Sequence, residues 1–157
     1  LPLVVDVGTP DKVGIDRLLG AVAARSLTPD GSPAVTVDVG TAVTVNLIDE
    51  AGVFRGGAIF PGPRLMARAL HRDTAALPDA DLNEVPAVAA LGRNTTEAIR
   101  AGVAAAVMGG VGLLVKRLAV QSPWPRLFLT GGGRGCLSRH LFPEADDVIE
   151  VPHLTLE

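Results

Sequence analysis

Cysteine is almost absent from this sequence, and histidine is rare. Cys136 is the one cysteine among 157 residues, and three histidines are scattered along the chain. A single cysteine cannot form an internal disulfide and fits a reducing compartment such as the cytoplasm. Because these side chains lack the close spacing of zinc ligands, the sequence gives no indication of a zinc site. We therefore expect a cytoplasmic protein without internal disulfides.

Clusters of positive charge are also missing. The sequence has 14 Lys and Arg residues against 17 Asp and Glu, its net charge is −3, and no basic run exceeds two residues. A nucleic-acid-binding surface would need a basic patch, so we expect no nucleic-acid partner. With 48% apolar and 20% charged residues, the composition is that of a folded chain rather than a disordered one.

The sequence shows neither a long apolar run nor a signal peptide. Its longest uncharged apolar run, residues 101–115, is bounded by Arg100 and Lys116. That run is shorter than the roughly 20 residues that span a bilayer, so we expect a buried helix and no membrane partner. Residues 1–5 lack the basic segment of a signal peptide. The length predicts one domain, and a start at Leu1 rather than Met is compatible with a piece of a longer protein.

The central stretch, residues 34–48, reads AVTVDVGTAVTVNLI and predicts two strands joined by a tight turn. Apolar residues alternate with smaller or polar ones on both sides of the turn, as in half-buried strands. Gly40 would let the backbone turn tightly and expose its N–H to an anion. Thr41 adds a hydroxyl and Asp38 a carboxylate at the mouth of the turn. These residues alone leave two alternatives open, a phosphate-binding turn and an ordinary hairpin with a polar tip.

The remaining periodicity predicts alternating strands and helices. The expected strands are residues 3–7, 53–59, 127–130 and 147–151, and the expected helices are residues 12–24, 64–71, 94–118 and 136–141. Asp16 would lie in the first turn of its helix, where the helix dipole stabilises a carboxylate. Glycines at 56–57 suggest a bulge or a close backbone approach. In the long helix, Asn94 and Glu97 would form a capping box, and many small residues would permit close packing on several sides.

A strand followed by Gly131–Gly133 and a predicted helix is the third feature of interest. This arrangement can place a helix N-terminus against a nucleotide. A glycine run by itself, however, is more often a simple turn.

Six short motifs occur in a fixed order, which is more specific than any one of them. They are GIDR (14–17), VDVGTAVTV (37–45), GGAIFPG (56–62), TAALP (74–78), GRNTTEAIRAG (92–102) and LTGGG (129–133). In this order they resemble the type III pantothenate kinases of the acetate kinase, sugar kinase, heat-shock chaperone and actin superfamily. The resemblance implies an α/β fold with a ribonuclease-H-like mixed sheet and flanking helices. Residues 1–157 would form a single domain that resembles the C-terminal, substrate-binding half of those kinases.

The resemblance also implies roles for residues that would meet the substrate. Asp16 corresponds to the carboxylate that orients the pantothenate hydroxyl as a general base, and Gly14 and Arg17 lie beside it in the substrate pocket. Gly57 corresponds to a glycine of the loop next to the substrate. Thr95 corresponds to a residue that reaches pantothenate from the other subunit of a homodimer.

ATP, Mg²⁺ and a monovalent cation, K⁺ or NH₄⁺, are the cofactors that the resemblance implies. Asp38 corresponds to the monovalent-cation site, and Gly40 and Thr41 to the phosphate-binding turn beside it. Gly131 and Gly132 correspond to the turn near the adenine and ribose.

One departure from the family pattern concerns its N-terminal half, which carries a D-x-G-N-T motif that grips the ATP phosphates. Residues 6–9 read DVGT, lack the Asn and end only seven residues before Asp16. We therefore expect that half to be absent from this chain and the chain alone to bind substrate rather than to catalyse.

Three functions are compatible with the residues. The first is ATP-dependent phosphorylation of pantothenate to 4′-phosphopantothenate, the first step of coenzyme A biosynthesis. The second is a non-enzymatic accessory or regulatory protein of the same family that acts by binding a partner. A different sugar or acyl kinase of the superfamily is the third, and the GIDR motif disfavours it.

Overall fold

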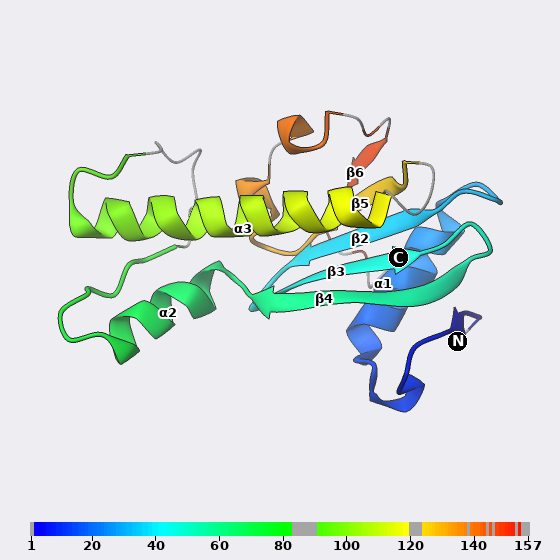
Figure 1. Ribbon diagram of the computed structural model, residues 1–157, viewed down its shortest axis with the longest axis horizontal. Coiled ribbons are helices and arrows are strands. Elements are labelled where there is room, and N and C mark those ends of the chain that lie inside the picture. The colour runs from blue at the N-terminus through cyan, green and yellow to red at the C-terminus, as the bar shows by residue number, and fades with distance from the viewer. Residues whose placement is uncertain are drawn as a thin grey trace.

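One mixed sheet organises the part of the chain that the computed structural model describes, residues 2–82, 91–119, 124–137, 139–143, 145, 147–152 and 154. Its strands in this part are β1 (Val4–Val5), β2 (Ala34–Val39), β3 (Ala42–Ile48), β4 (Val53–Pro61), β5 (Arg126–Thr130) and β6 (Val148–Glu150). They lie in the order β1-β4-β3-β2-β5-β6 (Figure 1). β2, β3 and β4 are antiparallel neighbours, and β5 and β6 continue the sheet in parallel beside β2. This is the predicted ribonuclease-H-like mixed sheet.

The long helix α3 (Thr95–Ala119) covers one face of the sheet and extends past its end to lie beside α2 (Pro63–Asp73) (Figure 1). Val107, Val111 and Val115 of α3 are fully buried against the alternating apolar residues of β2 and β3. Because side chains alternate across a strand, the polar residues between those positions must point to the opposite face. The valine pattern of the hairpin therefore fixes which face carries the polar groups.

That opposite face changes from apolar to polar along the strands. Near helix α1 (Ile15–Ser26), buried residues of the sheet pack with the alanines of the helix; they are Ala34, Ile48, Phe54 and Phe128. Near the Gly40–Thr41 turn, the same face carries polar residues: Thr36, Asp38, Thr44, Asn46 and Thr130. Across the strands, Thr36 lies opposite Asn46, and Asp38 lies between Thr44 and Thr130. The first turn of α1 comes to this polar end.

The helix termini follow the predicted start signals with small shifts. Gly14 is the N-cap of α1, which begins at Ile15 rather than at residue 12 because a short 3-10 turn, Pro10–Lys12, precedes it. Pro63 occupies the first turn of α2, as expected for a residue without an N–H. At the start of α3, the Glu97 N–H donates to Asn94 Oδ1 at 2.9 Å, and Glu97 Oε2 accepts from the Arg93 N–H at 2.7 Å.

Two predicted elements differ in the structure. The strand expected at residues 3–7 pairs with β4 only at Val4 and Val5. The helix expected at residues 136–141 is wrong: residues 134–136 and 139–141 form two short 3-10 turns, and Leu137 between them is extended. Glycines on both sides of Arg134 disfavour a continuous helix because glycine loses the most backbone entropy on ordering. In the described residues, the glycine run is therefore not followed directly by an α-helix.

Glycines in β4 confirm both the predicted bulge and the close approach. The pairing of β3 with β4 shifts between Leu47 and Ile48, and Gly56 has φ +88°. At Gly57, an added Cβ would overlap the Val45 carbonyl oxygen of the neighbouring strand. Gly57 therefore lies within a strand rather than in a loop, and its lack of a side chain lets β3 and β4 pair.

Helix α3 matches the helix predicted at residues 94–118 to within one residue at each end. Its 25 residues include an apolar 18-residue stretch, so it has the length and composition of a membrane span. Of that stretch, 33% is buried inside the structure. Three of its valines, Val107, Val111 and Val115, pack on the sheet, and a single helix of this length and composition is weak evidence for a membrane location.

Candidate functional site

The polar end of the α1 face of the sheet forms a cavity of about 380 Å³, which we call the acidic cavity. Gly14, Asp16, Arg17 and Gly20 contribute from α1 and its N-cap, and the sheet and adjoining segments contribute the rest: Thr36, Asp38, Gly40, Thr41, Ala42, Thr44, Asn46, Ile59, Thr130 and Leu154. Three of the predicted substrate residues, Gly14, Asp16 and Arg17, thus meet the predicted cation-site residue Asp38. They converge because the first turn of α1 lies over the polar half of the sheet.

Arg17 is held in place by Asn46, a residue that the sequence reading did not single out. The Arg17 Nε–H donates to Asn46 Oδ1 at 2.7 Å, and Asn46 Nδ2 donates to the hydroxyls of Thr36 at 3.2 Å and Thr44 at 3.4 Å. Asn46 is 1% exposed, so the amide cannot exchange these partners for water. The Arg17 guanidinium also lies over the Phe54 ring, 5.6 Å from its centroid, and burial lowers its pKa from the ordinary value.

Asp38 is the carboxylate of the acidic cavity whose charged form is disfavoured by its surroundings. Burial, followed by the negative charge of Asp16, raises the pKa of Asp38 above its ordinary value. Both effects act against the charged form, the first through lost hydration and the second through like-charge repulsion. A cation or a phosphate-bound metal ion beside these two carboxylates would relieve that repulsion.

This raised pKa gives a pH-dependent prediction for Asp38→Asn. An acid whose pKa is higher in the folded than in the unfolded state destabilises the fold once it ionises, and the penalty persists at neutral pH. We expect Asp38→Asn to raise the melting temperature at pH 7, with the gain shrinking as the pH falls through the Asp38 pKa towards about 4, where the wild-type carboxyl also becomes neutral. Thermal unfolding between pH 4 and 8 would measure this. Asp11→Asn, at an exposed position, is the control, and an equal gain in both variants would contradict the explanation.

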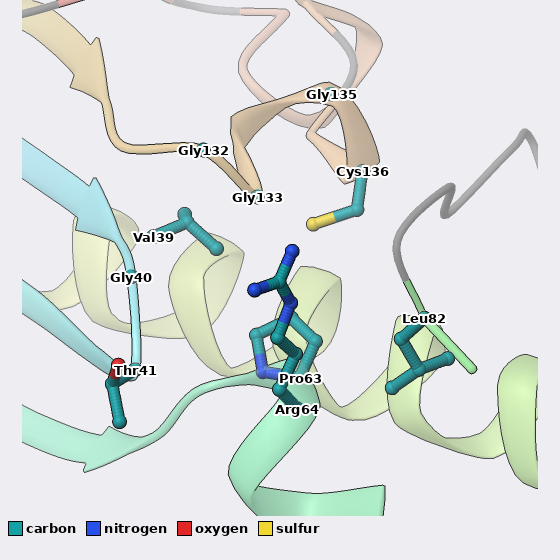
Figure 2. A pocket seen from close by; sticks show the side chains of 10 residues that line it. All are labelled: Val39, Gly40, Thr41, Pro63, Arg64, Leu82, Gly132, Gly133, Gly135 and Cys136. Atoms are coloured by element: carbon teal, nitrogen blue, oxygen red, sulfur yellow. The ribbon is translucent and has the colours of Figure 1, made fainter. Parts of the chain in front are cut away.

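A second cavity, of about 290 Å³, lies beyond the hairpin turn, and we call it the glycine cavity (Figure 2). It is lined by Val39, Gly40, Thr41, Pro63, Arg64, Leu82, Gly132, Gly133, Gly135 and Cys136. An added Cβ at Gly132 or Gly135 would meet nothing within 4 Å, so the backbone there is open to a ligand. Figure 2 shows the Arg64 guanidinium and the Cys136 sulfur both pointing into this space.

The Gly40–Thr41 turn lines both cavities. Its backbone differs from the prediction in one respect, because the Gly40 N–H donates to the Ala42 carbonyl at 3.0 Å and is engaged within the turn. Gly40 also lacks a positive φ. The turn is supported instead by Gly62, whose N–H donates to the Thr41 carbonyl at 2.8 Å and whose missing side chain makes room for the Gly40 carbonyl.

Gly131 and Gly132, predicted together, have different surroundings. Gly131 has φ +88°, and an added Cβ would lie within 2.6 Å of the Val39 carbonyl oxygen and overlap Asp38 Oδ1. Gly131 therefore leaves room for the Asp38 carboxylate, whereas Gly132 lines the glycine cavity.

Thr95 and Gly57 line neither cavity. Thr95 lies at the start of α3, in an apolar groove of about 730 Å³ between α2 and α3. Within one chain it belongs to a different site from Asp16, so it could reach the acidic cavity only as part of a partner subunit. Gly57 pairs with Asn46 across the strands, next to the residue that holds Arg17.

The described residues contain few side chains that could together bind a metal ion. No group of three or more His, Cys, Asp or Glu side chains there could hold a metal ion. Asp16 and Asp38 are a pair of carboxylates, which suits a weakly held cation shared with a ligand better than a tightly bound metal.

Comparison with known proteins identifies the family. Residues 1–117 match the type III pantothenate kinase family. The chain belongs to this family. It is 42% identical to a type III pantothenate kinase of Rhodopirellula baltica over 98% of this chain and 55% of that protein. For relatives from Halorhodospira halophila and Persephonella marina, the identity is 44% over 94% of this chain and 32% over 100% of it.

The chain spans little more than half the length of these pantothenate kinases, 55% to 59% of the three named relatives. The two cavities and the turn between them lie in the part of these relatives' length that the chain covers.

Proposed function

We propose that this chain is the substrate-binding part of an enzyme that transfers a phosphoryl group from ATP to pantothenate, giving 4′-phosphopantothenate for coenzyme A synthesis. It would be one domain corresponding to the C-terminal half of the family's proteins. The observation that carries the proposal is the position of the Gly40–Thr41 turn between the two cavities. A phosphate held at this turn from the glycine cavity would face a hydroxyl held in the acidic cavity. Phosphoryl transfer depends mainly on such positioning.

Each group in the acidic cavity has a chemical role in this proposal. Asp16, exposed in the first turn of α1, accepts the proton of the attacking hydroxyl. Arg17 offers a planar fork to the carboxylate of pantothenate, because its Nε is held by Asn46 while its two Nη groups have no partner among the described residues.

Cations complete the proposed site. The repulsion between Asp16 and Asp38 favours a monovalent cation at Asp38, where it would neutralise charge on the phosphate. Mg²⁺ would arrive with the triphosphate and polarise its oxygens. Gly40, Thr41 and Gly132 would hold the nucleotide.

A homodimer in the cytoplasm is the proposed assembly. The groove between α2 and α3 is almost wholly apolar and includes Thr95 and Gly102. It continues into exposed small residues of α3 and Leu113, which is 52% exposed. A second copy packed here would cover this surface and bring Thr95 to a partner's site.

Gly109→Glu is expected to weaken this dimer strongly. Gly109 is exposed on α3, and an added Cβ would meet nothing within 4 Å, so the change places a charge on the packing surface without disturbing the chain. Sedimentation velocity at micromolar concentration should show a dimer for the wild type and a monomer for the variant. Ala51→Glu, in the exposed turn before β4, is the control. A monomeric wild type would contradict the assembly.

Calorimetry with pantothenate tests the substrate assignment directly. The purified chain should bind pantothenate, and Arg17→Met should weaken binding by about tenfold to a hundredfold through loss of a charge-assisted hydrogen bond. Arg25→Met, outside the acidic cavity, loses an ion pair with the exposed Asp30 and a hydrogen bond to the Thr28 carbonyl and should bind as the wild type does. Absence of binding by the wild type would refute the substrate, and binding without phosphorylation by the full-length protein would favour the regulatory alternative.

A further inference from the structure

Arg64 is the one charged residue that lines the glycine cavity in the described part of the chain. The acidic cavity, in contrast, is lined by two carboxylates and one arginine, Asp16, Asp38 and Arg17. A polyphosphate, with several negative charges, would therefore meet two carboxylates on one side of the hairpin turn and only the positive charge of Arg64 on the other.

Arg64 lies near two acidic residues without pairing with them: Asp79 and Asp81 line a neighbouring cavity with it. It lies in the first turn of α2, where no acidic residue is present and where the positive end of the helix dipole already disfavours a cation. Arg72 at the other end of α2 pairs with Asp73, whereas Arg64 has no ion pair or side-chain hydrogen bond with the described residues. Its guanidinium instead points into the glycine cavity, opposite Cys136 and beside Gly133 (Figure 2).

We propose that Arg64 binds a phosphate group of the nucleotide in the glycine cavity and so positions the triphosphate against the Gly40–Thr41 turn. This inference rests on the proposed function and adds a residue that none of the six motif comparisons assigned. A guanidinium donates two parallel hydrogen bonds to phosphate oxygens, and the open backbone at Gly132 and Gly135 leaves room for the rest of the nucleotide.

Cys136 supplies a reporter for the same cavity. It is the one cysteine of the sequence, lines the cavity and is partly buried. Burial raises the pKa of its thiol, so its reaction with a chromogenic disulfide reagent is best followed at mildly alkaline pH. A nucleotide in the glycine cavity would shield the sulfur and slow that reaction.

The experiment measures the rate of Cys136 modification in the purified chain against the concentration of MgATP. The wild type should be protected. Arg64→Ala should need about ten to a hundred times more MgATP for half-protection, and Arg64→Lys should recover part of the loss. Arg68→Ala, one turn further along α2 and outside the glycine cavity, should match the wild type. Melting curves of the variants, together with equal modification rates without ATP, would show that the cavity is intact.

The outcomes separate this inference from the proposed function. Equal protection of the wild type and Arg64→Ala would overturn the role of Arg64 while leaving nucleotide binding in the cavity. No protection of the wild type at any MgATP concentration would overturn both the nucleotide assignment and the role of Arg64, even where calorimetry shows pantothenate binding. Equal weakening by Arg64→Ala and Arg68→Ala would show a general effect of positive charge and would also overturn the inference.

Discussion

Replacing Asp16 by Asn in the full-length protein is expected to lower the rate of pantothenate phosphorylation by about 10²–10⁴-fold, the usual contribution of a positioned acid–base group. The amide keeps the shape of the side chain but cannot accept the proton of the attacking hydroxyl. Pantothenate binding should persist, because Arg17 and its partner Asn46 are unchanged. The loss should therefore fall on kcat rather than on the dissociation constant, which calorimetry would measure beside the kinetic assay.

Glu50→Gln is a matched control for Asp16→Asn. Glu50 is exposed in the turn between β3 and β4 and lines neither cavity, so the same acid-to-amide change should leave kcat unaltered. An unchanged kcat in Asp16→Asn would remove this carboxylate from the mechanism. A large rise in the dissociation constant instead would show that Asp16 binds substrate and does not act as the base.

Gly131→Ala is expected to lower the free energy of unfolding by about 2–6 kcal/mol. A side chain at φ +88° is strained, which costs about 1–3 kcal/mol, and the added Cβ would overlap Asp38 Oδ1 and approach the Val39 carbonyl oxygen, which adds about 1–3 kcal/mol of overpacking. Denaturant unfolding followed by circular dichroism would measure the change.

The adjacent Gly132→Ala provides the comparison, since an added Cβ there would meet nothing within 4 Å. Its stability should stay close to that of the wild type, while its side chain would occupy part of the glycine cavity. Equal destabilisation by the two substitutions would show that the glycine run, rather than the contact of Gly131 with Asp38, is responsible.

The sequence was most informative where one local pattern determined a whole feature. Alternating valines predicted the β2–β3 hairpin, and that alternation also determines that Asp38 and Asn46 lie on the face opposite α3. A polar Asn in an otherwise apolar strand was the available signal for Asn46. Its partner could not be inferred from spacing, because Arg17 is 29 residues away and comes close only when α1 packs on the sheet.

Features that depend on contacts between distant segments escaped the sequence reading. The different surroundings of Gly131 and Gly132 arise from the packing of β5 beside β2, which a glycine run does not reveal. Arg64 reads as an ordinary exposed residue of a helix start, and its position over the glycine cavity depends on the sharp turn at Gly62. The helix predicted at residues 136–141 is wrong because the chain forms two 3-10 turns there with an extended Leu137 between them, and a strand followed by glycines does not determine which of these structures forms.

The amide that holds Arg17 has a consequence for the electrostatics of the acidic cavity. A carboxylate at position 46 would orient the guanidinium equally well but would cancel its charge. Asn46 accepts the same hydrogen bond while remaining neutral, so the guanidinium is fixed in direction and keeps its full charge. The cavity is otherwise lined by two acids, so an anionic group of a ligand can bind favourably only at the fixed position of the Arg17 guanidinium. The cavity therefore selects ligands by the position of their negative charge and not merely by its presence.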